Sequence, residues 1–266
     1  SEYDNYVSMD ITDGEQVHKV ITEISPDAVI HCAAWTAVDL AEDEENREKV
    51  RLINAIGTEN IAKACKDIDC KMMYISTDYV FDGSGDTPRT EDMPVAPIGV
   101  YGVTKADGEK AVAATTKEYY ILRTAWLYGW AGKNFVYTMI RAMNTHDAVK
   151  VVNDQKGTPT FAGDLAGVII KIIQKNNVPY GIYHCTDLGE ITWWDFTNEI
   201  KRQGIEKGWV TNKDCVVNPC ATEEYPTPTK RPAYSVLENR MFKLTSDFMF
   251  ANWEDALDVY LKDLLG

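Results

Sequence analysis

Asp27-Ala28-Val29-Ile30-His31-Cys32-Ala33-Ala34 has the pattern of a buried β-strand that runs into a turn of small residues. Residues 44–66 follow with apolar side chains at helical spacing, and residues 70–76 form the next apolar run. A strand, a helix and a second strand in this order predict a βαβ unit on a parallel sheet. A helix from near Val100 and a strand over residues 119–124 continue the alternation.

The pattern changes after Trp126, although strands and helices still alternate. We predict a helix near residues 134–143, a strand at 150–152, a helix over 161–174 and a strand over 181–185. The remainder of the chain reads as a smaller, loop-rich second domain. The fold class is therefore α/β, with a parallel sheet followed by a smaller C-terminal domain.

Composition excludes several classes of protein. The 266 residues are 45% hydrophobic and 26% charged, which is typical of a globular chain. The longest apolar runs fall far short of the roughly 20 residues that a transmembrane helix requires. The 27 basic and 41 acidic residues give a net charge of −14, which repels nucleic acid and anionic membranes. We therefore expect neither as a partner, and an anionic ligand would need a local group of Arg and Lys.

The cysteines and histidines predict neither a disulfide framework nor a metal site. No two cysteines have CxxC spacing, and a chain of this length does not need disulfides, so free thiols in a reducing cytoplasm are expected. The histidines are too scattered for a metal cluster, and His31 and His184 are expected in the core. The cysteines are Cys32, Cys65, Cys70, Cys185, Cys215 and Cys220.

Tyr101-Gly102-Val103-Thr104-Lys105 carries the first sign of chemistry. Tyr101 and Lys105 are four residues apart near a predicted helix start, so both side chains project from one face. A phenol is a poor acid at neutral pH, but a neighbouring ammonium favours the phenolate and lowers its pKa. Many helices contain this pair by chance, so the motif alone is weak.

A hydroxyl side chain strengthens the interpretation. Thr77 lies at the predicted carboxyl end of the strand that precedes the Tyr101 helix. There it can donate a hydrogen bond to a substrate carbonyl. Thr77, Tyr101 and Lys105 together predict a carbonyl-reduction site. In it Thr77 polarises the oxygen, Tyr101 delivers the proton, and Lys105 lowers the tyrosine pKa and holds the cofactor ribose.

The chain resembles the extended short-chain dehydrogenase/reductase superfamily and, within it, the dTDP-4-dehydrorhamnose reductase family. Seven segments carry the resemblance, and their joint occurrence in order is highly specific. They are residues 32–39, Asn54 with 57–60, 76–83, 101–105, 123–126, 152–160 and 230–232.

The resemblance implies a Rossmann-like, doubly wound sheet and hydride transfer from NADPH or NADH to the C4 ketone of dTDP-4-dehydro-L-rhamnose. The product would be dTDP-L-rhamnose for cell-surface polysaccharide, made in the cytoplasm by a monomer or homodimer. The dinucleotide-binding domain is expected over residues 1–150 with 161–186 returning to it. The dTDP-sugar domain is expected over residues 187–266 with 151–160.

The resemblance also implies roles for individual residues. Thr77, Tyr101 and Lys105 would be catalytic. The cofactor would contact Asp10, Ile11, Cys32, Ala33, Ala34, Thr36, Asn54, Tyr101 and Lys105. The substrate would contact Val38, Thr77, Asp78, Tyr79, Trp126, Asn153, Gln155 and Arg231. The Arg231 guanidinium suits a diphosphate even on an acidic protein.

Two departures bear on these expectations. A related dehydratase would carry an acidic residue after Asp78, whereas Tyr79 stands there, which favours simple reduction. The superfamily's GxxGxxG turn, whose amides meet the cofactor pyrophosphate, is not in this sequence. Residues 6–10 resemble the family's second strand, so about 20 to 30 residues with the first βα unit would be missing. We expect a fragment of a longer protein.

Two alternatives remain open. One is a non-catalytic, nucleotide-sensing regulatory subunit on the same scaffold, and the other is a different nucleotide-sugar reductase or epimerase. The acidic run of Asp39, Glu42, Asp43, Glu44 and Glu45 is interpreted as a solvated helix start. Trp193 and Trp194 are expected to pack between the domains.

Overall fold

The computed structural model describes residues 6–175, 177–245 and 248–265. Its main sheet has four parallel strands in the order β1-β2-β3-β8. The strands are β1 (Ala28–His31), β2 (Lys71–Thr77), β3 (Tyr119–Thr124) and β8 (Gly181–His184). Parallel neighbours need crossover connections, and helices lie between these strands in the chain. The predicted parallel α/β fold is confirmed.

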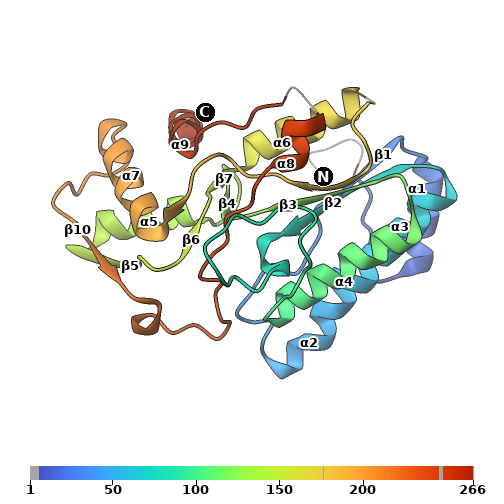
Figure 1. Ribbon diagram of the computed structural model, residues 1–266, viewed down its shortest axis with the longest axis horizontal. Coiled ribbons are helices and arrows are strands. Elements are labelled where there is room, and N and C mark those ends of the chain that lie inside the picture. Colours follow the sequence, from blue (N-terminus) through green and yellow to red (C-terminus); the bar gives the residue numbers. More distant parts are fainter. Residues whose placement is uncertain (1–5, 176, 246–247, 266) are drawn as a thin grey trace.

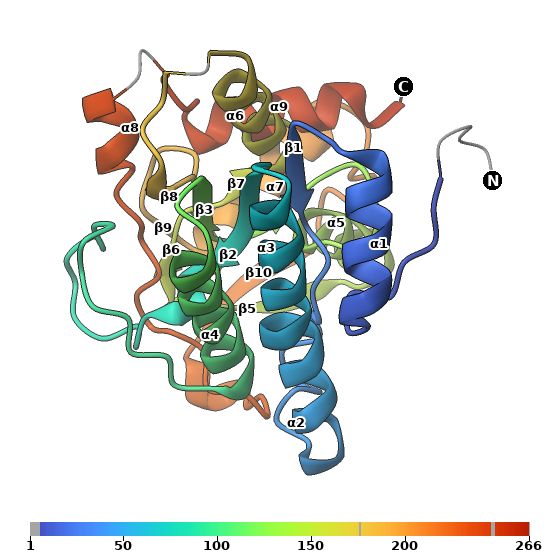
Figure 2. The same ribbon diagram turned by 90° about the vertical axis from the view of Figure 1, so that its right-hand side faces the viewer.

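Helices cover both faces of this sheet. They are α1 (Gly14–Ile24), α3 (Thr58–Asp67), α4 (Val100–Thr115), α6 (Ala162–Lys175) and α8 (Arg240–Thr245). Met72 and Tyr74 of β2 point to the face that α1, α3 and α4 cover, which Figure 2 shows toward the viewer. Met73 points to the opposite face, against α6 and α8. Strand side chains alternate between faces, so the apolar run of β2 fits a sheet buried on both sides.

The second half of the chain builds another apolar core beside the sheet (Figure 1). Its main elements are α5 (Phe135–Thr145), β5 (Ala148–Val152), α7 (Trp193–Glu206), β10 (Val216–Cys220) and α9 (Trp253–Lys262). β5 and β10 pair in parallel. Short elements complete the connections: β4 (Leu127–Tyr128), β6 (Lys156–Gly157), β7 (Thr160–Phe161), β9 (Ile191–Thr192), η2 (Asp78–Val80), η3 (Thr222–Glu224) and η4 (Asp263–Leu265).

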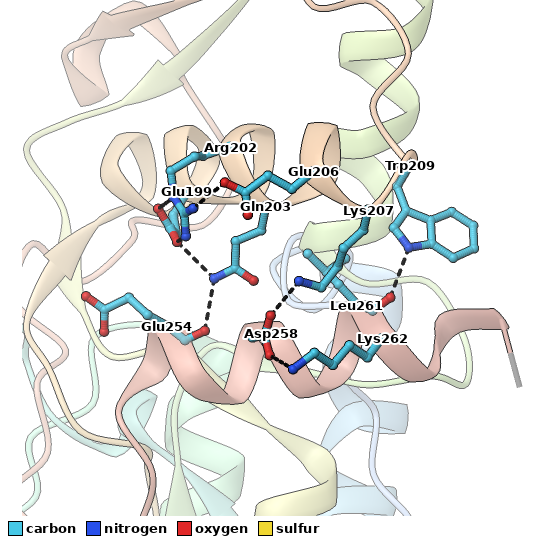
Figure 3. Close-up of polar contacts among 10 residues, drawn as sticks. All are labelled: Glu199, Arg202, Gln203, Glu206, Lys207, Trp209, Glu254, Asp258, Leu261 and Lys262. Atoms are coloured by element: carbon cyan, nitrogen blue, oxygen red, sulfur yellow. Dashed lines mark hydrogen bonds and ion pairs between the residues drawn. The ribbon is translucent and has the colours of Figure 1, made fainter.

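Polar contacts fasten α9 to α7 along one side of this second core (Figure 3). Gln203 of α7 donates from Nε2 to the Glu254 carbonyl oxygen, 3.0 Å away. Lys207 forms an ion pair with Asp258 of α9. Trp209 donates from its indole Nε1 to the Leu261 carbonyl oxygen at 2.9 Å. The C-terminal helix is thereby fixed on the core that α7 supports.

Three predictions need correction. Residues 6–10 form no strand, because no described strand lies beside them to complete a hydrogen-bonded ladder. The helix predicted over 44–66 divides into α2 (Glu44–Arg51), a π-helical turn η1 (Leu52–Gly57) and α3. The tail after residue 187 is less loop-rich than predicted, because α7 and α9 bury apolar faces that the sequence reading did not recognise as helical.

Candidate active site

The carboxyl end of β2 presents Thr77 at the edge of the parallel sheet. The Thr77 Oγ1 accepts a hydrogen bond from the Tyr79 amide at 3.2 Å and donates to the Asp78 carboxylate at 2.9 Å. These contacts cap the short helix η2 and fix the Thr77 side chain. Ligands of open α/β sheets bind beyond the carboxyl ends of the strands, which is where this hydroxyl lies.

The first turn of α4 brings Tyr101 to Thr77. The Thr77 side chain is near enough to Tyr101 to lower the pKa of the phenol, against a larger rise from burial. Its ring meets the ring of Tyr79 edge to face, with 5.5 Å between ring centroids. Gly102 permits this approach, because a Cβ at that position would lie 2.2 Å from the Tyr79 carbonyl oxygen. Thus β2 and α4 place the predicted polarising hydroxyl and the predicted proton donor on either side of Tyr79.

The electrostatics of Tyr101 differ from the prediction. Its pKa is raised, first by burial and then by the neighbouring Asp78 carboxylate. Burial also raises the pKa of Asp78 to about 6, although the nearby Ser235 and Thr77 hydroxyls oppose the rise. The expectation that Lys105 lowers the pKa of Tyr101 is therefore wrong for this structure. A protonated phenol is the form that can donate a proton.

Lys105 lies one turn further along α4 and is buried against β2. Its Nζ donates to the Ile75 carbonyl oxygen at 2.7 Å and lies 4.1 Å from the centroid of the Tyr74 ring. Burial lowers its pKa to about 7, and the charges of Glu109 and Cys32 oppose that shift. The Lys105 ammonium is therefore held at Ile75 of β2, two residues before Thr77.

A buried ion pair supports this edge of the sheet from below. The Arg123 guanidinium of β3 donates to both carboxylate oxygens of Glu109 on α4, at 3.0 and 2.7 Å. The Ser76 hydroxyl donates to the same carboxylate at 2.5 Å. His184 of β8 lies 3.4 Å from Arg123, and burial lowers its pKa to about 3. One polar network therefore ties α4 to β2, β3 and β8.

The predicted cofactor residues gather around the end of β1. Cys32, Ala33 and Thr36 are exposed in the loop that follows the strand, Ala34 is partly buried, and Cys32 is near enough to Lys105 for each charge to shift the other's pKa. The buried Asn54 holds this loop, because its side chain accepts from the Trp35 amide at 2.8 Å. The same side chain donates to Thr104 of α4 at 3.2 Å. Asn54 lies in the π-helical turn, a feature that often marks functional sites.

The other two predicted cofactor residues lie further along the same side. Ile11 packs against Gly57, where a Cβ would lie 2.8 Å from the isoleucine side chain. Its carbonyl oxygen accepts from the Asn60 side chain at 3.0 Å. Asp10 is exposed and accepts hydrogen bonds from Thr12. Ile11 therefore lies next to the π-helical turn that carries Asn54.

The donor set fits the nicotinamide ribose of a dinucleotide. An ammonium has three donors, and Lys105 uses one of them on the Ile75 carbonyl oxygen. Lys105 also lies near Cys32 of the exposed loop after β1, so its remaining donors suit the hydroxyls of a ribose bound at that loop. The described residues contain no GxxGxxG turn for the pyrophosphate.

A cavity of about 460 Å³ opens at Asp78 and Tyr79, the two residues that follow Thr77, while Thr77 and Tyr101 themselves are not among its lining residues. Five predicted substrate residues line it: Asp78, Tyr79, Trp126, Gln155 and Arg231. Trp126 forms an aromatic wall, because its ring stacks on Trp193 with 3.4 Å between centroids and 10° between planes. The backbone of Trp126 has a positive φ of 49°, and Gly157 leaves room for the indole.

The Arg231 guanidinium already has two partners at the cavity. It donates to the Tyr79 hydroxyl at 3.0 Å and to the Asp39 carboxylate at 2.6 Å. Thr229 strengthens the contact between these segments, since its amide donates to Asp39 and its hydroxyl donates to the Val38 carbonyl oxygen. The segment before Pro232 is thereby fixed to the loop after β1.

Three further substrate predictions, Val38, Thr77 and Asn153, do not line the cavity. Val38 contributes its carbonyl oxygen to Thr229, and Asn153 accepts from the Thr192 hydroxyl at 2.8 Å. Sequence reasoning missed several lining residues. They are Phe135, Thr138, Met139, Lys150, Val151, Val152, Trp193, Tyr225, Thr227, Pro232 and Ser235. The Trp193-Trp194 pair is a visible signal in the sequence, and although it favours interdomain packing over a recognition surface, Trp193 lines the cavity.

The acidic run is more than a solvated helix start. Asp39 pairs with Arg231, and the Glu42 carboxylate accepts from the Val100 amide at 2.8 Å. Glu42 therefore caps the N-terminus of α4, where negative charge is stabilising. These partners are more than 50 residues away in the chain, so local sequence could not reveal them.

The core predictions for the histidines are confirmed, with His31 and His184 buried. All six cysteines are free thiols. Within the described ranges no helix is both long and apolar enough to cross a membrane.

Comparisons with known proteins place this geometry in a family. The model of the RmlD substrate binding domain matches residues 4–265. The dTDP-4-dehydrorhamnose reductase of Streptomyces griseus is 39% identical over 97% of this chain and 84% of its own length. The crystal structure of a dTDP-4-dehydrorhamnose reductase from Clostridium acetobutylicum has a TM-score of 0.89 and 47% identity, covering 97% of this chain and 88% of that one.

A second solved structure, the Bacillus anthracis dTDP-4-dehydrorhamnose reductase in complex with NADP, has a TM-score of 0.90 and 39% identity. The alignment covers 98% of this chain and 91% of that one. With a family match across nearly all of its length and these relatives, the chain belongs to the RmlD family of dTDP-4-dehydrorhamnose reductases.

Proposed function

We propose that this chain reduces the C4 ketone of dTDP-4-dehydro-L-rhamnose to an alcohol, giving dTDP-L-rhamnose for cell-surface polysaccharide. The observation that carries the proposal is the packing of Tyr101 against Tyr79, whose amide is hydrogen-bonded to the Thr77 hydroxyl at the end of a parallel strand. A cavity with an aromatic wall and two cationic side chains begins at Asp78 and Tyr79, directly after Thr77. Family membership supports the same reaction.

The proposed roles follow from the contacts. The Thr77 hydroxyl hydrogen bonds with the ketone oxygen and holds it against the Tyr101 hydroxyl. Tyr101 then donates its proton to that oxygen as negative charge develops, and regains a proton from solvent afterwards. The raised pKa of Tyr101 keeps the phenol protonated before reaction. Tyr79 cannot remove a carbon-bound proton as a carboxylate could, so the site favours reduction over elimination.

NADPH or NADH is the cofactor, and when bound it supplies the hydride that adds to C4. Lys105 would hold the ribose next to the nicotinamide, and Cys32, Ala33, Ala34, Thr36 and Asn54 would line the same cleft. Asp10 and Ile11 would lie at the adenine end. These residues surround the end of β1 and the buried ammonium of Lys105.

The dTDP-sugar would occupy the cavity. Trp126 would face the sugar, with Asp78 and Tyr79 beside it, while Gln155 and Arg231 would meet the nucleotide. Val38 and Asn153 would act from the margins, through the segments that they fasten. We also propose a cytoplasmic location, a monomer or homodimer, and the two domains at residues 1–150 with 161–186 and 187–266 with 151–160.

The experiment follows the absorbance of the reduced nicotinamide with dTDP-4-dehydro-L-rhamnose. The chain is compared with a version preceded by a βα unit that carries a GxxGxxG turn. Turnover by either version, lost on Thr77→Ala, supports the reductase. Silence from both would overturn it and favour the nucleotide-sensing regulatory subunit, while turnover of other nucleotide-sugar ketones alone would favour a different reductase.

A further inference from the structure

Arg231 alone does not offset the negative charge that a diphosphate would bring into the cavity. Three charged residues occur among its described lining residues: Asp78, Lys150 and Arg231. Arg231 is engaged by Asp39 at 2.6 Å. A diphosphate brings about two negative charges into a protein whose net charge is −14, so a second cation is needed.

Lys150 reaches the cavity from a different wall than Arg231. It lies in the middle of β5, opposite Asn218 of β10 in the sheet register. Its neighbours Val151 and Val152 also line the cavity, so the strand itself forms that wall. The Lys150 side chain is 65% exposed and is therefore free to turn toward a ligand.

Glu224 holds the Lys150 ammonium, with 3.3 Å between Nζ and the nearer carboxylate oxygen. Glu224 is itself fixed, because its other carboxylate oxygen accepts from the Ala221 amide at 3.1 Å. The same turn is bound to the end of β5, where the Asp154 carboxylate accepts from Thr222. The carboxylate thus marks a defined position for an anionic partner of Lys150.

We propose that Lys150 is a second diphosphate-binding residue of the cavity, and that Glu224 holds its ammonium until the phosphate oxygens replace the carboxylate. The inference rests on the proposed function, since it takes a nucleoside diphosphate as the occupant. An exposed ion pair contributes little free energy, so its exchange for phosphate costs little. Phosphate then accepts a charge-assisted hydrogen bond from the same ammonium.

The test measures binding of dTDP and of thymidine by titration calorimetry to wild type, Lys150→Gln, Glu224→Gln and the double variant. Lys150→Gln is expected to weaken dTDP binding by about tenfold, the loss of one charge-assisted contact. Glu224→Gln is expected to strengthen it by about threefold, because a weak competitor is removed. Neither change should move thymidine affinity, and Glu224→Gln should have no effect once Lys150 is replaced.

Lys156→Gln is the matched control. Lys156 lies six positions further along, pairs with Glu190 at 2.9 Å and is 52% exposed, but does not line the cavity. Equal losses from Lys150→Gln and Lys156→Gln would overturn the inference, as would equal losses for thymidine and dTDP. Wild-type protein that binds no dTDP would instead overturn the proposed function, and the inference with it.

Discussion

Two ion pairs of this molecule lie in opposite surroundings. Arg123 and Glu109, beneath the catalytic edge of the sheet, have side chains only 3% and 6% exposed. Lys150 and Glu224, at the cavity, are 65% and 53% exposed. Removing one partner of a buried ion pair costs several kcal/mol of stability, whereas an exposed ion pair can exchange a partner with little change in free energy. The proposed catalytic edge thus rests on a buried pair, and the proposed nucleotide side on a pair that can exchange partners.

The same contrast extends to the residues around each pair. Lys105 is buried and bound to a strand carbonyl oxygen, so its position is set before any substrate arrives. Arg231 is about a quarter exposed and shares its guanidinium between Asp39 and Tyr79. A fixed reacting centre and adjustable binding groups are a common division in enzymes, because catalysis depends on geometry more than affinity does.

The largest effect is expected at the reacting centre. Tyr101→Phe removes the proposed proton donor, so turnover should fall by about 10²- to 10⁴-fold. Affinity for dTDP should stay within about twofold, because the ring and its packing remain. Tyr180→Phe, at an exposed tyrosine far along the chain, is the control. Unchanged turnover in steady-state assays of Tyr101→Phe would remove the proposed mechanism.

The second effect concerns stability. Glu109→Gln leaves the buried Arg123 charge uncompensated, which should lower the free energy of unfolding by about 3–5 kcal/mol. Glu224→Gln breaks an exposed pair and should cost less than about 1 kcal/mol. Urea unfolding of both variants measures the difference. If both variants lost a similar free energy of unfolding, the contrast between the buried pair and the exposed pair would be contradicted.

A third effect separates binding from stability on the nucleotide side. Arg231→Gln should raise the dissociation constant of dTDP by about 10- to 100-fold, because hydrogen bonds to charged groups contribute about 1.5–3 kcal/mol. The free energy of unfolding should change by less than about 1 kcal/mol. Arg202→Gln, in an exposed pair on α7, provides the reference for calorimetry and unfolding. If dTDP bound the two variants equally well, the cavity would not be the nucleotide site.

The smallest effect is a pH dependence of stability at a buried carboxyl group. Asp187 accepts from the Phe161 amide at 2.9 Å, and burial together with Asp164 raises its pKa. A carboxyl group whose pKa is raised on folding stabilises the fold at low pH, and this contribution is lost as the pH rises from about 4 past the raised value. The melting temperature of wild type should therefore fall with pH by a few degrees more than that of Asp187→Asn. Parallel curves for the two proteins would contradict this assignment.

The sequence predicted what depends on local pattern and on order along the chain. The main strands and the helix of Tyr101 followed from apolar spacing, and β2 with α4 brought Thr77 and Tyr101 together as expected. Contacts between distant segments could not be predicted in that way. Lys150 reads as an ordinary exposed strand residue, and its place in the cavity depends on the fold of the segment around Glu224.

The missed helices and the misjudged pKa have similar physical causes. The amphipathic face of α7 includes large aromatic residues, and a pair of tryptophans in a sequence predicts interdomain packing without indicating a helix. The pKa of Tyr101 depends on burial and on the Asp78 carboxylate, neither of which spacing along a helix reveals. The sequence predicts that Asp39 and Glu42 are solvated, because their partners, Arg231 and the Val100 amide, come from distant parts of the chain.

The most direct measurement uses a nicotinamide cofactor that carries deuterium at the transferred position, with dTDP-4-dehydro-L-rhamnose as substrate. The product is analysed by mass spectrometry and NMR for wild type and for Tyr101→Phe. The account predicts dTDP-L-rhamnose with deuterium at C4 from wild type, and a loss of that product from the variant. Deuterium at another carbon, or the same yield from both proteins, would contradict it.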